Sequence, residues 1–146
     1  MISIKKDNDY VKALLKQDEG IQLDFKQNIS NSLKVAKTIA AFANTSGGKL
    51  VIGISDKKQI IGIDADEEMY MIDQANIKHV SPPVSIYYEI FEVSSLEDEK
   101  PKSDTIILIA HILESNSKPH AFVNGQLSKI FYYRQGDKSL PMIDEI

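Results

Sequence analysis

The sequence predicts an α+β domain with a mixed, mostly antiparallel sheet and packed helices. The spacing of apolar residues changes between the helical period and the two-residue period of strands, and this gives the order α-β-α-β-β-α-β-β-β. Strands and helices do not take turns regularly, as they do in a protein with a parallel sheet. The chain has 146 residues, of which 42% are hydrophobic and 26% are charged, and this is the composition of an ordinary globular domain. We therefore expect one domain over residues 1–146, which is either the whole protein or a piece of a longer one.

The N-terminal third is predicted to hold two helices and one strand. Apolar positions spaced i, i+3 and i+4 indicate a short amphipathic helix over residues 8–17, with Asn8 or Asp9 as its N-cap. Apolar and polar side chains alternate over residues 21–26, which is the pattern of a half-buried strand. A broad apolar stripe over residues 33–43 indicates a second helix with one buried face.

The middle of the chain is predicted to add a β-hairpin and a third helix. The nearly unbroken apolar run at residues 50–54 indicates a central strand, and residues 60–63 follow a polar turn and are expected to pair back with it. Residues 65–79 indicate another helix. The Pro82-Pro83 pair ends this unit, because a residue that precedes proline avoids the α region.

Three more strands are predicted in the C-terminal half. Residues 84–93 alternate in polarity, residues 105–113 are almost continuously apolar, and residues 130–134 are rich in aromatic side chains. A charged surface loop is expected over residues 94–103, and Gly136 is expected to end the last strand.

Composition excludes several classes of protein. The chain has no cysteine, which rules out disulfides, thiolate metal sites and cysteine nucleophiles and fits a reducing cytoplasm. We expect no membrane partner, because the sequence shows neither a signal peptide nor a long apolar run. The net charge is −4, and Arg134 is the only arginine beside 16 lysines. Reading of guanine edges by arginine is therefore not expected, whereas phosphate contacts by lysine stay open.

The segment Asn44-Thr45-Ser46-Gly47-Gly48-Lys49 is the first candidate site. Adjacent glycines allow a positive φ and a close approach by another group, and a turn of this kind can present backbone N–H groups to an anion. The alternative is that the segment only ends a helix and leads into a strand, a place where glycine is also common. We expect at least one of Gly47 and Gly48 to have a positive φ.

Acidic side chains form the second candidate site. Asp24 shares one face of its strand with Lys26, Glu19 precedes that strand, and Asp56 follows the central strand. If the two strands are neighbours, the three carboxylates can converge on a divalent cation such as Mg²⁺ or Mn²⁺. The alternative is a solvated, charged strand edge without a ligand.

A third candidate site lies in the C-terminal half, where Lys118 and the pair Tyr133-Arg134 bring basic and aromatic side chains together. Such side chains can stack on bases and neutralise phosphates. The alternatives are sheet packing for the tyrosines and a surface ion pair for the arginine. The histidines show no spacing typical of a zinc site or a catalytic triad.

These motifs occur together and in a fixed order. They are EGIQLDFK (19–26), FANTSGG (42–48), IGISD (52–56), IGI (61–63), PPV (82–84), KP (118–119) and YYRQG (132–136). The combination resembles the Schlafen AlbA_2 domain family, and FANTSGG followed by IGISD is its most specific part. The resemblance covers nearly the whole chain.

The resemblance implies an Alba-like α+β fold that binds nucleic acid. Bacterial members of the family often stand at the head of transcriptional regulators. Vertebrate members form a two-lobed clamp on RNA, and some carry a metal-dependent ribonuclease site of three carboxylates. By position these carboxylates correspond to Glu19, Asp24 and Asp56, although the family usually has Glu where this chain has Asp24. The family also carries an older ATP-binding label, for which this chain shows no P-loop lysine-and-hydroxyl pair.

Our first interpretation is a DNA- or RNA-binding regulatory module, in preference to an enzyme, that contacts phosphates and single-stranded or shaped regions. We expect a cytoplasmic homodimer, because two copies would supply the two lobes of the family's clamp. The alternatives are a ribonuclease that uses Glu19, Asp24 and Asp56 with Mg²⁺ or Mn²⁺, and an ATP-binding regulatory module. The residues expected to contact nucleic acid are Lys26, Asn44, Thr45, Gly47, Gly48, Lys49, Lys118, Tyr133 and Arg134.

Overall fold

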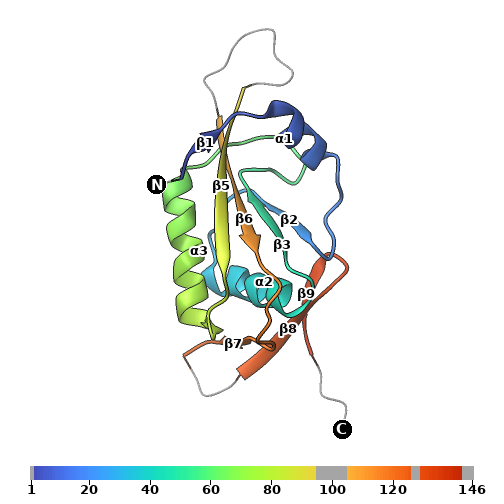
Figure 1. The fold of residues 1–146 in the computed structure, drawn as a ribbon, viewed down its shortest axis with the longest axis vertical. Helices are drawn as coiled ribbons and strands as arrows, with labels where there is room; N and C mark the ends of the chain where they lie inside the picture. The colour runs from blue at the N-terminus through green and yellow to red at the C-terminus, as the bar shows by residue number, and fades with distance from the viewer. Residues whose placement is uncertain (1, 95–104, 126–128, 143–146) are drawn as a thin grey trace.

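The computed structural model describes residues 2–94, 105–125 and 129–142, and it is built around a five-stranded mixed sheet (Figure 1). The strands lie in the order β1 (Ile4–Lys5), β5 (Ile86–Val93), β6 (Thr105–Ile112), β3 (Gly48–Ile52) and β2 (Leu23–Lys26). The outer strands β1 and β2 run parallel to their neighbours, and the other pairs are antiparallel. The predicted α+β class with a mixed sheet is therefore confirmed.

Two helices cover one face of this sheet. α2 (Ser32–Asn44) and α3 (Ala65–His79) begin at the N-caps Asn31 and Asp64, whose side chains accept backbone N–H groups of the first turn. Apolar side chains of both helices and of the sheet form the larger hydrophobic cluster of the protein. None of the helices in the described ranges has the length and apolar character needed to cross a lipid bilayer.

A second, antiparallel sheet packs on α2 from the side away from the central sheet (Figure 1). Its strands are β4 (Val80–Ser81), β7 (Ala121–Val123), β8 (Lys129–Gln135) and β9 (Lys138–Pro141). Phe122 and Tyr132 of this sheet belong to the same hydrophobic cluster as α2. The helix α2 is thus enclosed between two sheets, which explains why nearly all of its residues from Val35 to Asn44 are buried.

The helix α1 (Asn8–Leu15) packs on the opposite face of the central sheet. Its residues Val11 and Leu14 join a second hydrophobic cluster that includes Val51 of β3 and Ile109 of β6. A helix of eight residues is only about 12 Å long, so α1 covers one end of this face. Among the described residues, no helix lies over the end of this face where β3 begins and β6 ends (Figure 1).

The predicted hairpin between the strand 50–54 and residues 60–63 forms only in part, as a short antiparallel pairing without a second strand. Ile54 and Ile60 form an antiparallel bridge, and the N–H groups of Ile61 and Gly62 donate to the carbonyl oxygen of Gly53. The backbone N–H of Ile63 donates to Ile106 of β6 instead. Residues 60–63 therefore lie beside the start of β6 and form no strand.

Several short elements were not predicted. The strands β1, β4, β7 and β9 have two to four residues each, too few to show an alternating pattern in the sequence. The N-cap of α1 is Asp7, not Asn8 or Asp9. Of the predicted loop 94–103, all but the first residue lies outside the described ranges.

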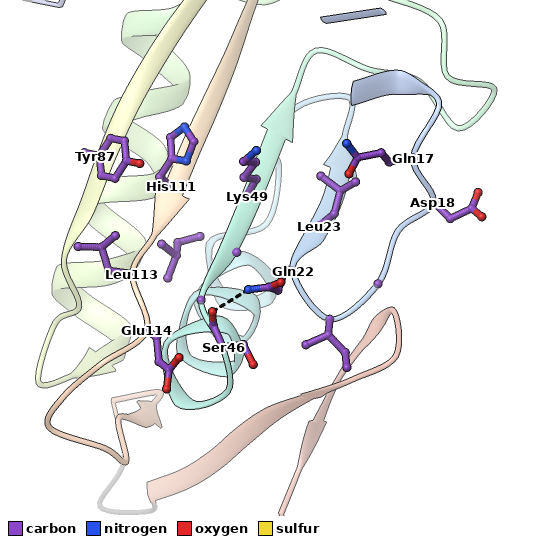
Figure 2. Close-up of a pocket in the computed structure, with 15 residues that line it drawn as sticks. Gln17, Asp18, Gln22, Leu23, Ser46, Lys49, Tyr87, His111, Leu113 and Glu114 are labelled. Atoms are coloured by element: carbon purple, nitrogen blue, oxygen red, sulfur yellow. Dashed lines mark hydrogen bonds between the residues drawn. The ribbon is translucent and has the colours of Figure 1, made fainter. Parts of the chain in front are cut away.

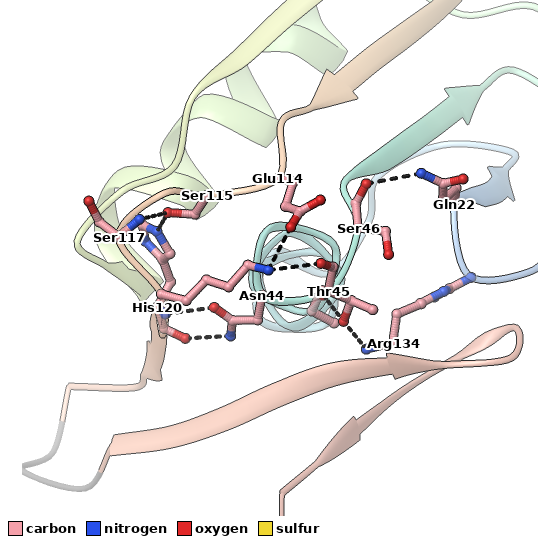
Figure 3. A network of polar contacts seen from close by, with 11 residues as sticks. Gln22, Asn44, Thr45, Ser46, Glu114, Ser115, Ser117, His120 and Arg134 are labelled. Carbon is pink, nitrogen blue, oxygen red and sulfur yellow. Dashed lines mark hydrogen bonds and ion pairs between the residues drawn. The ribbon is translucent and has the colours of Figure 1, made fainter.

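Asn44, the last residue of α2, ties this helix to the second sheet. Its Nδ2 donates to the carbonyl oxygen of His120 at 2.9 Å, and its Oδ1 accepts the backbone N–H of His120 at 2.7 Å (Figure 3). The same Nδ2 also donates to the carbonyl oxygen of Tyr132 at 3.0 Å. Asn44 is only 4% exposed. All three bonds are therefore shielded from water, which makes each one expensive to lose.

We expect Asn44→Ala to lower the free energy of unfolding by about 3 kcal/mol, because it leaves buried backbone groups of His120 and Tyr132 without partners. Urea unfolding followed by circular dichroism measures the change. Asn116→Ala is the matched control, because Asn116 is exposed and its truncation should change stability by less than about 0.5 kcal/mol. Equal losses in the two variants would contradict the role assigned to Asn44.

Candidate nucleic-acid interface

An open groove of about 590 Å³ lies where β3 begins and β6 ends (Figure 2). Its floor is the end of the central sheet, and the segment before β2 forms one side. Gln22 of that segment donates to the carbonyl oxygen of Ser46 at 3.0 Å and so joins this side to the turn after α2. The lining residues are Gln17, Asp18, Gly20, Ile21, Gln22, Leu23, Ser46, Gly47, Gly48, Lys49, Tyr87, His111, Ile112, Leu113 and Glu114.

The glycine pair forms part of the groove floor, and its geometry confirms the expected positive φ. Gly47 has a φ of +72°, and its N–H donates to the carbonyl oxygen of Phe42 at 2.7 Å. A Cβ at Gly47 would lie 2.8 Å from the backbone of Ile112 and Glu114, and one at Gly48 would lie 2.6 Å from the ring of Phe42. A side chain at either position would therefore clash with the protein itself. Because glycine has no side chain, the main chain of the turn forms the surface of the groove at this point.

Lys49 supplies a positive charge to the groove. It lies on the uncovered end of the sheet face, beside Leu23 of β2 and His111 of β6. Its Nζ donates to the phenol oxygen of Tyr10 at 3.3 Å and lies 5.7 Å from the centre of that ring. Within the described residues Lys49 has no carboxylate partner, so its charge is available to an anionic ligand.

Tyr87 and His111 form an aromatic pair beside Lys49, and sequence analysis missed both. Their ring centres are 4.3 Å apart and their planes differ by 7°. Glu89 accepts a hydrogen bond from the Nε2 atom of His111 at 2.5 Å and one from the Nζ atom of Lys5 at 2.6 Å. The pairing depends on the register between the consecutive strands β5 and β6, so the only available signal was the alternation of Tyr87 and Glu89 along one strand.

Charge neutralisation holds Glu89 in its ionised form. Partial burial alone would raise the pKa of this carboxyl group, but the hydrogen bonds from Lys5 and His111 outweigh burial and lower the pKa below its ordinary value. At neutral pH Glu89 is therefore an anion that orients the imidazole of His111 under Tyr87.

The three carboxylates do not converge, and the expected metal centre is corrected. Asp24 faces α2 and is 4% exposed, whereas Asp56 lies exposed in a turn beyond the far end of β3. β2 and β3 are neighbours, which was the condition for convergence, but they run parallel with Asp24 beside Leu50. The two aspartates therefore sit at different levels of the sheet. The described part of the chain contains no group of three His, Cys, Asp or Glu residues that could hold a metal ion.

Glu19 and Asp24 do form a close pair. Glu19 accepts the backbone N–H of Phe25 at 3.0 Å, and its pKa is raised by its hydrogen bond to Asp24 and by burial. Asp24 in turn lies 3.2 Å from Nζ of Lys26 and 3.5 Å from Nη2 of Arg134. The first of these contacts engages Lys26, which was expected to face nucleic acid, in an ion pair with its own strand.

Arg134 holds the fold together, which corrects its expected contact with nucleic acid. Its side chain is only 2% exposed. Its guanidinium donates to the carbonyl oxygens of Gly20 and Leu23 at 2.9 and 3.2 Å and to the hydroxyl of Ser139 at 3.1 Å, and it lies over the ring of Phe42. With these donors engaged inside the protein, Arg134 presents no surface to a ligand.

The remaining expected contacts also bind the protein itself. The hydroxyl of Thr45 donates to Ala41 and accepts the backbone N–H of Arg134. Lys118 donates to the carbonyl oxygen of Thr45 at 3.1 Å and to Glu114 at 2.7 Å (Figure 3). Asn44 is occupied as described above, and Tyr133 is half-buried on β8. Of the nine residues expected to contact nucleic acid, the structure brings Gly47, Gly48 and Lys49 into the groove.

We expect Gly47→Ala to destabilise the protein by about 2 kcal/mol more than Gly136→Ala. Both glycines have positive φ values, +72° and +57°, so both variants bear the strain of a left-handed alanine. Only the Cβ at position 47 also meets backbone within 3 Å, whereas nothing lies within 4 Å at position 136. Thermal unfolding of the two variants measures the difference, and equal losses would show that the close contact is unimportant.

Comparisons with known proteins agree with this architecture. The uncharacterized ATP-binding protein UU034 of Ureaplasma parvum serovar 3 is 34% identical over 117 residues, which cover 72% of this chain and 33% of that protein. The crystal structure of the DIP2311 protein from Corynebacterium diphtheriae matches with a TM-score of 0.51 and 19% identity, over 90% of this chain and 25% of that one. The second likeness concerns the fold alone.

This chain spans about a third of the length of the curated relative and a quarter of the length of the structural one. The sequence profile of the Schlafen, AlbA_2 family matches residues 19–143. That match extends from the paired carboxylate Glu19 through the glycine turn to the last described strand. The chain therefore belongs to the Schlafen AlbA_2 family.

Proposed function

We propose that this domain is a regulatory module that binds nucleic acid in the groove beside the Gly47-Gly48 turn, with Lys49 as a phosphate contact. The observation that carries the proposal is that Lys49, which has no carboxylate partner among the described residues, shares the groove with the exposed Tyr87 two strands away. A cation beside an aromatic ring suits a polymer of phosphates and bases.

The charges around the groove support an anionic ligand despite the net charge of −4. Both acidic side chains in the lining have cationic partners, because Asp18 lies 3.6 Å from Lys58 and Glu114 lies 2.7 Å from Lys118. These pairs offset the negative charge at the rim, whereas no carboxylate of the described residues pairs with Lys49. The groove therefore favours phosphate over a cationic ligand.

A second candidate function is nucleotide binding. The name of the Ureaplasma parvum relative describes an ATP-binding protein, and a groove of about 590 Å³ lies within the size range of small-molecule sites. ATP would use the same cation and aromatic ring as a nucleic acid. A rise in melting temperature with millimolar ATP, in the absence of binding to any oligonucleotide, would favour this second function.

We propose DNA or RNA as the ligand and a transcriptional regulator as the protein that carries the domain. We do not propose a metal-dependent ribonuclease, because Glu19, Asp24 and Asp56 form no common site.

We expect Lys49→Gln to weaken binding several-fold at low salt and to reduce the slope of log K against log salt concentration by about one unit, because one phosphate contact is lost. Fluorescence anisotropy with single- and double-stranded DNA and RNA at two salt concentrations measures both effects. Lys78→Gln, on the exposed side of α3, removes the same charge far from the groove and should leave the slope unchanged. Loss of affinity in both variants to the same degree would sink the assignment of Lys49.

We also expect a homodimer, since a single copy with net charge −4 presents a small basic surface and a two-fold axis doubles it. Multi-angle light scattering at micromolar concentrations measures the mass. A clean monomer across that range would contradict the expectation.

A further inference from the structure

We propose that Tyr87 is a stacking platform for a single unpaired base, and that the groove therefore selects single-stranded over double-stranded nucleic acid. This inference rests on the proposed function, because it names the form of nucleic acid that the same groove takes.

The ring of Tyr87 is supported on one face and open elsewhere. His111 stacks on it at 4.3 Å in a nearly parallel plane, yet Tyr87 remains 52% exposed. Within the described residues, His111 provides the only ring contact of Tyr87. β1 pairs with β5 only at Ile90 and Phe91, so no described strand lies on the outer side of Tyr87. A large aromatic surface thus stays uncovered at the edge of the groove, where a planar base can stack.

The support beneath Tyr87 is fixed by a chain of polar contacts. His111 is held by Glu89, and Glu89 is held by Lys5. Because Glu89 and Lys5 lie on two different strands, the imidazole is braced from the sheet and not from a loop. Tyr87 rests on this fixed imidazole, so its ring loses little conformational entropy when a base stacks on its other face, which favours binding.

The spacing of Tyr87 and Lys49 suits one strand of nucleic acid. Tyr87 lies opposite His111, and His111 lies opposite Lys49, on three successive strands of the sheet (Figure 2). Two strand spacings place the tyrosine about 10 Å from the lysine. Because His111 covers the face of Tyr87 toward Lys49, a base stacks on the opposite face, and a phosphate at Lys49 belongs to a neighbouring nucleotide of the same strand.

Strand selectivity follows from the geometry of the bases. In a duplex each base is stacked between its neighbours and paired, so its flat face is not available to a protein ring. A single strand can turn one base out and place it on Tyr87 without breaking a pair. Duplex ends and backbones would still meet Lys49, but without the contribution of stacking.

The test compares two single-stranded oligonucleotides of about 12 nucleotides, one with bases and one of the same length that is abasic, by fluorescence anisotropy at low salt. We expect wild type to bind the base-containing strand about tenfold more tightly than the abasic strand. Tyr87→Ala should reduce this ratio to about one and leave the affinity for the abasic strand unchanged, whereas Tyr87→Phe should keep the ratio. Tyr70→Ala is the matched control, because Tyr70 is 61% exposed on α3, away from the groove.

Each outcome decides between the two proposals. Equal binding of both strands by wild type would overturn the stacking platform and leave phosphate binding intact, and this result requires no variant to fold. An unchanged ratio in Tyr87→Ala, or an equal loss in Tyr70→Ala, would also overturn it. Failure of every oligonucleotide to bind would overturn the proposed function and the inference together.

Discussion

The C-terminal end of α2 has to be satisfied inside the protein, and the rest of the structure is arranged around this requirement. A helix leaves its last carbonyl groups without intrahelical partners, and here those groups are enclosed between two sheets. Distant or turn residues supply the donors: the Thr45 hydroxyl to Ala41, the Gly47 N–H to Phe42, the Ser115 N–H to Ala43 and the Lys118 ammonium to Thr45. The last turn of α2 contains no basic residue, so Lys118 also supplies the cation that favours a helix C-terminus.

The same region explains why residues of the family motifs turn inward. Asn44 joins α2 to β7 and β8, and Arg134 joins β8 to the segment before β2. The buried Asp24 lies 3.5 Å from Arg134, so the charge of the guanidinium is partly balanced inside the protein. A buried ion of either sign is strongly destabilising when its partner is removed. These residues therefore stay together as a structural unit, and the surface of the turn, with Lys49, is left to meet a ligand.

Local pattern was enough to predict the main helices and strands, because burial of one face imposes a period of 3.6 or of two residues on the sequence. The pattern also located the glycine turn and Lys49. It did not show whether Asp24 faces solvent or α2. Alternation of polarity along a strand separates its two faces, but it does not tell whether the polar face is covered by another element. Nor did it show that β2 runs parallel to β3, which separates Asp24 from Asp56. The pairing of Tyr87 with His111 depends on a strand register that no single segment encodes.

The turn at Gly47 and Gly48 makes part of the groove out of main chain. Where a side chain would normally stand, the backbone of the turn lies directly against the backbone at the end of β6. The shape of this part of the surface is then fixed by φ, ψ and hydrogen bonds and not by the identity of neighbouring side chains. Charged and aromatic residues at the rim of the groove can consequently be substituted without a change in the shape of its floor. One scaffold can therefore bind ligands of different length and composition.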